Sequence, residues 1–590
     1  MRDKLKACFP AGRGVFHREF AELIVELDGR AGEAADRLRL AAALVSYQLE
    51  QGQVCLKLNE AAGRRILIGT GDPDSSLEIQ APQLAEWLET LQNSRVVSAE
   101  GTQERPLVLA GDGRLYLRRY WEYQRRLRAA LVSRAVDTEA DPAAVRVQLD
   151  RVFDAPGDAI DWQRLAAALA LHRRLSVITG GAGTGKTTTV VKILTALRQL
   201  EGPAVRIALA APTGKAAARL SDSIRGAKAR MPLPAEELDG IPEAAGTIHR
   251  LLGVRRHSPT FRHGPANPLA LDCLVLDEAS MVDLALMCKL VEALPPHARL
   301  IMLGDPNQLA AVEAGPVLAE LAGPGAECFS GGCAQWLGDA TGMTVPASTD
   351  NPVGLADTVV ELKVTHRYAG NLGKFAEAVK RGDAAHALEL IDDPAVEDVG
   401  WHKGEPGRWL TAELQHDIEA WFQGYRQGDP AEALRRLDEF RLLCAHREGP
   451  SGIGVANALI ERGLRKRGAI IGGEWYPGRP VMVTRNDYAL ELYNGDVGVC
   501  LPDEAGVQRV WFPGSKTPRA FAPGRLPEHE TVFAMTVHKT QGSEFGRILL
   551  LLPERESPIV NRSLIYTAVT RAKQAVRIYG SAGLLMSACR

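Results

Sequence analysis

The sequence contains no run of apolar residues approaching the about 18 that a membrane-spanning helix needs. Its first residues, MRDKLKACFPAGRG, lack the apolar core of a secretion signal. The formal net charge of −2 over 590 residues provides no overall attraction for nucleic acid or for a membrane surface. We therefore expect a cytoplasmic protein with no membrane partner, in which any site for a polyanion is a local groove.

Cysteine is too scattered to build a disulfide framework or a metal site. Only Cys328 and Cys333 of the nine cysteines lie close together, and no second pair or histidine cluster completes a set of ligands. Buried thiols in a reducing compartment are the expected state. What the sequence does have is length: 590 residues exceed what one hydrophobic core supports, so about three or four domains are expected.

The first part of the chain is predicted to be a mainly helical N-terminal domain, residues 1–110. Two helical runs, FHREFAELIVEL and LAAALVSYQLEQ, precede a strand-like VCLKL. The region has no phosphate-binding loop and stands apart from the α/β pattern that follows. We therefore predict a docking domain for a partner subunit, with a brace packed on the domain that follows as the alternative. Residues 111–150 are predicted to be a linker. Gly111-Asp112-Gly113 is read as a hairpin turn, a basic helical run follows it, and residues 136–145 are an acidic stretch with proline.

Beyond the linker, apolar strands alternate with helices, which is typical of a doubly wound parallel sheet. The strands LSVITG, RIALAAP, CLVLDEA and RLIMLGD are apolar throughout, as parallel strands covered on both faces should be. We predict one α/β domain at 151–330 and a second in two parts, at 331–469 and 534–590. A segment rich in Gly, Ala, Ser, Thr and Pro, residues 323–358, is predicted to be a mobile loop.

Residues 470–533 have a different pattern, with short strand-like pieces separated by Gly and Pro turns. The pattern predicts a small β-barrel inserted into the second α/β domain. Its aromatic residues Trp475, Tyr476 and Trp511 are expected to fill its core, which is the commoner role for aromatics.

The segment GGAGTGKT, residues 180–187, is a complete G-x-x-x-x-G-K-[ST] pattern between the strand LSVITG and the helix TTTVVKILTAL. In that setting, backbone N–H groups of the loop and of the helix N-terminus wrap the phosphates of ATP. Lys186 is expected to reach the β- and γ-phosphates, and Thr187 to bind Mg²⁺. The alternative is a glycine-rich turn with an incidental lysine. The predicted ATP contacts are Gly180, Gly181, Ala182, Gly183, Thr184, Gly185, Lys186, Thr187 and Thr188.

Polar residues also follow two later strands. Asp277 is expected to hold Mg²⁺ with its water, and Glu278 to polarise the attacking water, because hydrolysis needs an oriented nucleophile. Gln308 follows the next strand, where loops face the ligand, and is expected to sense the γ-phosphate. Asp305 in the same loop is alternatively a helix N-cap.

Two arginines in the second half of the chain are candidates for catalysis. Arg571, in LIYTAVTRAKQAV, and Arg367, in ELKVTHRYA, are predicted to neutralise charge that develops on the γ-phosphate. A lone arginine is otherwise an ordinary solvated charge. If they come from a second domain, ATP binds in a cleft that opens and closes with hydrolysis, which is the physical basis of a motor.

The motifs resemble those of the superfamily 1 helicases, and they occur in the same order. They are GGAGTGKTTT, APTGKAAARL, TIHRLLG, VLDEASMVD, LGDPNQLAAVEAG, THR (365–367), MTVHKTQGSEF and IYTAVTRA. Within that group the chain resembles the RecD family, the alpha subunits of exonuclease V (RecBCD), and this implies two RecA-like motor domains and an SH3-like barrel. The departures are Ala182 and Ala310 where proline is frequent, and Gln53 where histidine is frequent. None of them removes a catalytic group.

The resemblance also implies binding residues. It assigns Gln163 to adenine recognition, whereas the sequence alone favours an exposed helical glutamine. It implies that the segment MTVHKTQGSEF, residues 535–545, touches two ligands at once. Contacts to DNA phosphates are implied for Thr213, Lys215, Thr247, His249, Thr536 and His538, and contacts toward the nucleotide for Gln541, Gly542 and Glu544.

The function implied is an ATP-dependent 5′-3′ DNA helicase and translocase that works with RecB-like and RecC-like subunits on double-strand DNA ends, in recombinational repair. One alternative is a stand-alone helicase related to RecD. Another is a regulatory switch that binds ATP without unwinding DNA. The intact Asp277-Glu278 pair, Gln308 and the two arginines favour hydrolysis over a switch.

Overall fold

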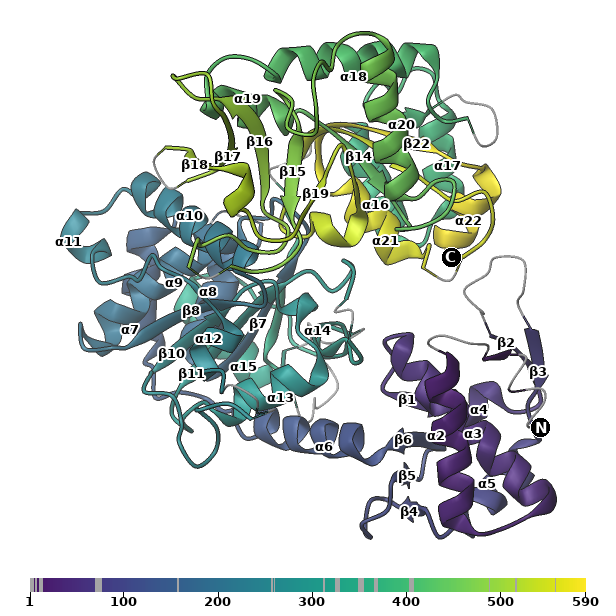
Figure 1. Cartoon of the computed structure of the whole chain (residues 1–590). Helices are drawn as coiled ribbons and strands as arrows, with labels where there is room; N and C mark the ends of the chain where they lie inside the picture. Colours follow the sequence, from purple (N-terminus) through teal and green to yellow (C-terminus); the bar gives the residue numbers. More distant parts are fainter. Residues whose placement is uncertain are drawn as a thin grey trace.

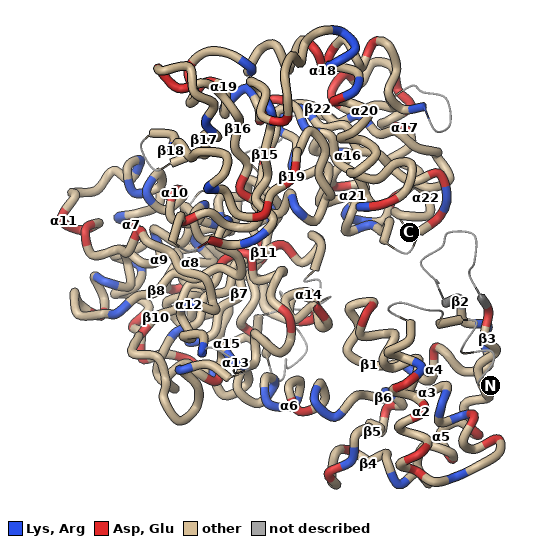
Figure 2. Tube along the Cα trace, in the orientation of Figure 1, with Lys and Arg blue, Asp and Glu red and all other residues tan. Residues whose placement is uncertain are grey.

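The chain forms an N-terminal domain and two larger α/β domains. A long helix, α6 (Arg118–Val132), leads from the N-terminal domain to the first α/β domain (Figure 1). The computed structural model describes residues 5, 8–9, 14–68, 77–155, 157, 159–255, 258, 260–310, 313–323, 329–348, 355–365, 370–402, 408–487, 489–514, 517–557 and 559–589. Basic and acidic residues are interspersed over all the domains (Figure 2), and the formal net charge of the whole sequence is −2. No helix within these ranges is long and apolar enough to cross a bilayer.

The first α/β domain is built on six parallel strands in the order β12-β7-β11-β10-β8-β9. The strands are β7 (Leu175–Gly180), β8 (Ile207–Ala211), β9 (Gly246–Thr247), β10 (Cys273–Leu276), β11 (Arg299–Gly304) and β12 (Val359–Leu362). One face is covered by α7 (Pro142–Val152), α8 (Trp162–His172), α9 (Lys186–Glu201), α10 (Gly214–Arg230) and α15 (Gly331–Thr341). The other is covered by α6, α12 (Ile248–Leu252), α13 (Leu284–Glu292) and α14 (Val317–Leu321). The predicted parallel α/β architecture is therefore confirmed for this domain.

The boundary predicted at residue 330 is wrong, because β12 pairs with β7 and completes the first sheet. Part of the predicted loop 323–358 is also a helix: α15 begins after Ser330, whose hydroxyl accepts from the backbone N–H of Cys333, and it packs on α7 and α8. Glycines and small residues hide this helix in the sequence. Its stability comes from tertiary packing rather than from helix propensity.

The predicted linker, 111–150, is also wrong as a structural description. It contains β6 (Arg114–Leu117) of the N-terminal sheet, α6, and most of α7. The acidic stretch with proline is the start of α7: Asp141 caps the helix by accepting from the N–H of Ala144, and Pro142 occupies the first turn. Proline at this position is compatible with a helix, because the first turn needs no N–H donor there.

The second α/β domain has five parallel strands in the order β13-β22-β21-β14-β20. They are β13 (Val399–Trp401), β14 (Phe440–Cys444), β20 (Ala534–Thr536), β21 (Phe545–Leu551) and β22 (Ala572–Tyr579). One face is covered by α16 (Asn371–Arg381), α17 (Ala384–Asp392), α21 (Arg562–Val569) and α22 (Ala582–Cys589). The other is covered by α18 (Ala412–Tyr425), α19 (Pro430–Leu437) and α20 (Ile453–Lys466).

The segment inserted before β20 forms an antiparallel sheet in the order β18-β17-β16-β15-β19. The strands are β15 (Pro480–Val483), β16 (Val497–Pro502), β17 (Gln508–Phe512), β18 (Arg519–Phe521) and β19 (His529–Thr531). Within the described ranges the edge strands β18 and β19 do not pair with each other. Tyr476 and Trp511 pack into the core beneath α18, so this sheet is joined to the second α/β domain by shared apolar contacts.

The N-terminal domain combines helices with a four-stranded sheet in the order β1-β6-β5-β4. Its helices are α2 (Gly14–Asp28), α3 (Gly32–Glu50), α4 (Leu58–Ala61) and α5 (Leu84–Gln92). Its strands are β1 (Cys55–Lys57), β4 (Val97–Ala99), β5 (Leu107–Leu109) and β6, with β2 (Arg65–Ile68) and β3 (Leu77–Gln80) as a separate pair. The sheet includes the strand-like VCLKL and the predicted hairpin around Gly111, which pairs β5 with β6.

Candidate nucleotide and DNA site

The phosphate loop connects the end of β7 to the start of α9, as the sequence predicts. Gly183 and Gly185 have φ angles of 81° and 83°, which favour glycine, and Gly185 is the N-cap of α9. Gln163, at the start of α8, donates from Nε2 to the carbonyl of Thr184 at 3.0 Å. A Cβ at Gly185 would collide with the same amide group. Gln163 is therefore a half-buried residue packed on the loop rather than an exposed helical glutamine.

Lys186 directs its ammonium group back over the loop. Nζ donates to the carbonyls of Gly180 at 2.6 Å and of Gly181 at 2.9 Å. Thr184 closes the turn by donating from its hydroxyl to Gly181 at 3.0 Å. The cation is thus held at the N-terminus of α9, where backbone N–H groups favour an anion. Thr187 and Thr188 follow in the first turn of that helix, half-buried.

The acidic pair lies at the neighbouring strand ends, because β7, β11 and β10 are adjacent in the sheet. Burial and the nearby Glu278 carboxylate raise the pKa of Asp277 to about 7, while Lys186 acts in the opposite direction. Glu278 has a φ angle of 50°, and its N–H donates to Asp277 Oδ1 at 2.9 Å. The two carboxylates therefore interact with each other, and Asp277 also interacts with Lys186 of the phosphate loop.

Gln308 and Arg571 meet although they lie in different domains. Arg571 Nη2 donates to Gln308 Oε1, and Gln308 Nε2 donates to Asp305 Oδ2 at 3.0 Å. Arg571 is 4% exposed and Gln308 is 7% exposed, so Arg571 is not a solvated charge. The interface also includes the backbone of Leu309: its N–H donates to the Thr567 hydroxyl at 2.8 Å, and its carbonyl accepts from Gln541 Nε2 at 2.8 Å.

Arg367 lies outside the described residues. The segment leading to it starts against the phosphate loop, where the Thr365 hydroxyl donates to the carbonyl of Ala182 at 3.1 Å. A cavity of about 700 Å³ opens on this side of the loop, between Gly181 of the first domain and the helices α16, α17 and α21 of the second. A cleft between the two α/β domains therefore reaches the phosphate loop.

The segment MTVHKTQGSEF joins two strands rather than a strand and a helix. It runs from β20 through a 3-10 turn (Val537–Thr540) into β21. Gly542 needs its φ of 73°, and a Cβ there would lie 3.6 Å from Arg219 of the first domain. Glu544 forms an ion pair with Lys573 at 3.4 Å. With the Gln541 contact to Leu309, the C-terminal half of the segment faces the first domain, while Thr536 and His538 stand half-buried at its other end.

Two of the candidate DNA contacts also have structural roles. Thr213 caps α10 by accepting from the N–H of Ala216 at 3.2 Å, and Thr247 caps α12 by accepting from the N–H of Arg250 at 3.2 Å. His249 is exposed, with its ring edge-on to Phe261. A cap uses only one lone pair of the hydroxyl, so each threonine retains its donor for a phosphate.

Lys215 contacts the inserted sheet, which sequence reasoning did not anticipate. Its Nζ donates to the carbonyl of Gly495 at 2.9 Å, and burial lowers its pKa to about 8. The ring of Tyr493 packs directly against Gly214, and Lys539 donates to Asn494 Oδ1 at 2.9 Å. One turn between β15 and β16 thus joins the loop after β8 to MTVHKTQGSEF, and no motif in the sequence predicts this contact.

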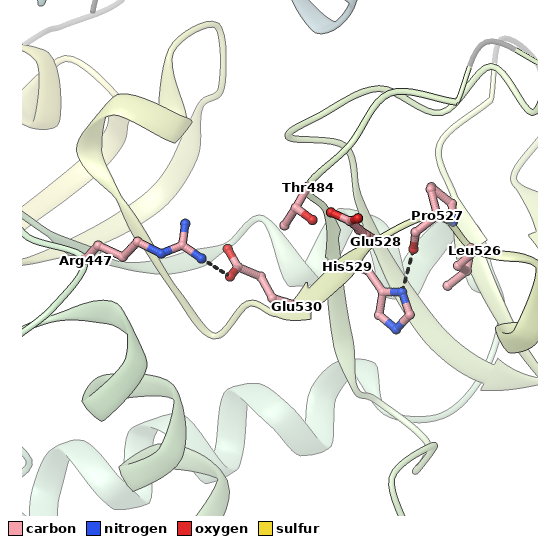
Figure 3. Close-up of a pocket in the computed structure, with 7 residues that line it drawn as sticks. All are labelled: Arg447, Thr484, Leu526, Pro527, Glu528, His529 and Glu530. Carbon is pink, nitrogen blue, oxygen red and sulfur yellow. Dashed lines mark hydrogen bonds and ion pairs between the residues drawn. The ribbon is translucent and has the colours of Figure 1, made fainter. Parts of the chain in front are cut away.

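A groove of about 720 Å³ lies where the inserted sheet meets the second domain (Figure 3). Arg447, which follows β14, forms an ion pair with Glu530 at 3.1 Å, and His529 donates from Nδ1 to the carbonyl of Pro527 at 2.7 Å. Thr484 lines the same groove. Since β14 and β20 are parallel neighbours, Arg447 lies at the same end of the sheet as Thr536.

Two parallel α/β domains that share one phosphate loop, and that meet at a buried glutamine–arginine contact, define a two-domain P-loop ATPase of the motor class. Three family models match successive parts of the chain. They are the RecBCD enzyme subunit RecD, N-terminal domain (16–116), the AAA domain (163–314) and the UvrD-like helicase C-terminal domain (531–579).

Relatives span nearly the whole chain. It is 39% identical to the RecBCD enzyme subunit RecD of Mycolicibacterium smegmatis, over 93% of this chain and 91% of that protein. It is 32% identical to the same subunit of Haemophilus influenzae, over 100% of this chain and 96% of that protein. The ATP-dependent RecD2 DNA helicase of Deinococcus radiodurans is 31% identical over 80% of this chain but only 56% of that protein. The chain belongs to the RecD family of RecBCD enzyme subunits.

Proposed function

We propose that the chain is the ATP-dependent 5′-3′ DNA helicase subunit of a RecBCD-like complex that processes double-strand DNA ends for recombinational repair in the cytoplasm. The observation that carries the proposal is the buried contact between Gln308 and Arg571. It joins the domain of the phosphate loop to an arginine of the second domain. ATP bound between them would hold the cleft closed, and its hydrolysis would release it.

Each predicted residue has a role in this cycle. Lys186 and the loop N–H groups bind the phosphates, Gln163 the adenine edge, and Glu278 orients the attacking water. Arg571 and Arg367 neutralise charge developing on the γ-phosphate. Gln308 reports the presence of that phosphate to the second domain.

The donor set also fits Mg²⁺. Oxygen ligands are available from the Thr187 hydroxyl and the Asp277 carboxylate, and the raised pKa of Asp277 reflects burial and a negative neighbour that a divalent cation would offset. When bound, Mg²⁺ would supply positive charge to the β- and γ-phosphates. We assign Thr187 and Asp277 as its protein ligands.

Two alternatives are less well supported. A stand-alone helicase related to RecD is less well supported by the comparisons. The N-terminal domain model of the RecBCD subunit RecD matches residues 16–116, and the chain is 39% identical to such a subunit over 93% of its residues, against 31% over 80% for the RecD2 helicase. A regulatory switch without unwinding would not need a buried arginine beside the γ-phosphate sensor.

ATP turnover measured with and without single-stranded DNA distinguishes a motor from a switch. Co-purification from native cells, with two large partners or none, distinguishes a subunit from a solitary helicase.

We propose the N-terminal domain as the docking surface for a partner subunit. Helix α2 presents Phe16, Leu23 and Leu27 to solvent, with exposed fractions of 68%, 51% and 58%. Their spacing places them along one side of the helix, and clustered exposed apolar residues are typical of interfaces. The alternative is that this domain braces the first motor domain. One contact fits it: the N–H of Gly315 in that motor domain donates to the carbonyl of Gly52 at 3.1 Å.

Replacing Phe16, Leu23 and Leu27 together by serine should therefore abolish co-purification of the partner subunits. It should leave DNA-stimulated ATP turnover within about twofold, since α2 packs on α3 within the N-terminal domain and these three side chains are exposed. This triple substitution is cleaner than deleting the domain, because Val54 belongs to a core shared with the first motor domain. Val147→Ser, at an equally exposed valine on α7, is the control. Loss of ATP turnover with assembly retained would contradict the docking role.

We propose that the inserted sheet is an SH3-like barrel on the path of the DNA, with the groove of Figure 3 at its edge. Arg447→Gln should weaken binding of single-stranded DNA and reduce the slope of log affinity against log salt by about 0.7, the value for one phosphate contact. Arg435→Gln, at an exposed arginine of α19 paired with Glu432, is the control. Unchanged affinity and slope in Arg447→Gln would exclude the groove from the DNA path.

A further inference from the structure

Tyr566 lies on α21 of the second motor domain, but its hydroxyl reaches into the first. It donates to Asp305 Oδ2 at 3.1 Å, across the domain boundary. A Cβ at Gly181 would lie 3.1 Å from the same hydroxyl oxygen, so the group is also against the phosphate loop. The side chain is 4% exposed. The nucleotide-binding roles assigned above do not use this hydroxyl.

Asp305 links the Tyr566 hydroxyl to Gln308, because its carboxylate accepts hydrogen bonds from both side chains. This carboxylate is 2% exposed and accepts three hydrogen bonds: from the N–H of Asn307 at 3.1 Å, from Gln308 Nε2 at 3.0 Å and from Tyr566 at 3.1 Å. A buried carboxylate is costly unless donors surround it, so each donor helps to fix its position. Among the described residues, Tyr566 is the donor that comes from the second domain.

The carboxylate in turn fixes the orientation of the Gln308 amide. Its NH₂ group must face Asp305, which only accepts, and its oxygen must face Arg571, which only donates. A rotated amide would place like groups against each other on both sides. Gln308 therefore presents one defined face to the nucleotide cleft as long as Asp305 stays in place.

Tyr566 and Arg571 lie on the same short stretch of the second domain, one in α21 and the other just after it. They hold the loop after β11 at two points, Asp305 and Gln308. Any movement of α21 relative to the first domain must break or reform both contacts. The two contacts therefore connect the closure of the cleft with the orientation of the γ-phosphate sensor.

We infer that Tyr566 is a positioning residue for ATP hydrolysis, whose hydroxyl holds Asp305 and thereby orients Gln308 when the two motor domains are closed. The inference rests on the proposed motor function. Its competitor is a purely packing role, since the ring also belongs to the apolar core of the second domain. Phenylalanine keeps the ring and removes only the hydroxyl, so it separates the two roles.

The test is the ATP turnover of the full chain carrying Tyr566→Phe, with saturating single-stranded DNA. We expect kcat to fall about three- to tenfold, as for the loss of one hydrogen bond, with the KM for ATP within about twofold. Tyr425→Phe is the matched control: that tyrosine is fully buried in α18, and its hydroxyl has no partner among the described residues. A kcat unchanged in Tyr566→Phe, or lowered equally in Tyr425→Phe, would overturn the inference.

A double substitution tests the route through Asp305. In an Asp305→Ala background, adding Tyr566→Phe should cause little further loss of kcat, because alanine leaves Tyr566 no side-chain oxygen to bind at position 305. Independent, multiplying losses would overturn the route. If the unaltered chain shows no DNA-stimulated turnover, the proposed function fails together with this inference. If the unaltered chain is active and Tyr566→Phe matches it, only the inference fails.

Discussion

Lys186→Gln should abolish ATP hydrolysis while leaving the fold intact. The ammonium group of Lys186 is the point charge proposed for the β- and γ-phosphates, and no other lysine is in this loop. We expect turnover with single-stranded DNA to fall by at least about a hundredfold, the range seen when one group that stabilises transition-state charge is removed. The fold should persist, because a glutamine amide can still donate to the carbonyl of Gly180 or Gly181, which Lys186 now binds.

The control for this substitution is on the same helix. Lys192 lies further along α9, and its ammonium stands 4.0 Å from the centre of the Phe153 ring, away from the phosphate loop. Lys192→Gln removes the same charge from the same helix and should keep most of the turnover. The measurement is the steady-state rate at saturating ATP and DNA, with the unfolding temperature of each variant. Near-normal turnover in a well-folded Lys186→Gln protein would refute the site.

The first motor sheet could be predicted from the sequence because its signals are local. Each central strand is an uninterrupted apolar run, and the phosphate loop must stand between a strand and a helix. The edge strand β12 could not be predicted to join this sheet. Its partner β7 lies far away in the sequence, and only the folded chain brings them together. The helices α7 and α15 were hidden because proline and glycine at their starts indicate breaks when read alone.

The candidate site was also predictable only where its signals are local in the sequence. Motifs placed Lys186, Asp277 and Gln308 at the ends of adjacent strands, where the structure has them. The contact between Gln308 and Arg571 joins residues 263 positions apart, and a sequence gives no distance between them. The turn at 493–495 and the hydroxyl of Tyr566 carry no recognisable motif. Their roles arise from the packing of one domain on another, which depends on shape complementarity over the whole interface.

The segment MTVHKTQGSEF should couple DNA binding to hydrolysis, because its two ends are proposed to face different ligands. At one end Gln541 donates to the carbonyl of Leu309, the residue after the proposed γ-phosphate sensor Gln308. At the other, Thr536 and His538 stand at the sheet edge near Arg447. Coupling requires an element whose state both sites change, here the open or closed arrangement of the motor domains. A simple strand connection would not need a side chain that crosses to the first domain.

Gln541→Ala and Glu544→Ala should therefore keep ATP binding, since Lys186 and the phosphate loop remain, but lose most of the stimulation by single-stranded DNA. Coupling free energies of about 1–3 kcal/mol correspond to a loss of about five- to 150-fold in that stimulation, and unwinding should fall with it. His538→Ala should instead mainly weaken DNA binding. The measurements are nucleotide affinity and ATP turnover with and without DNA, and Glu554→Ala, at an exposed glutamate beyond β21, is the control. If Gln541→Ala and Glu544→Ala both keep full stimulation, the segment is only a connection between two strands.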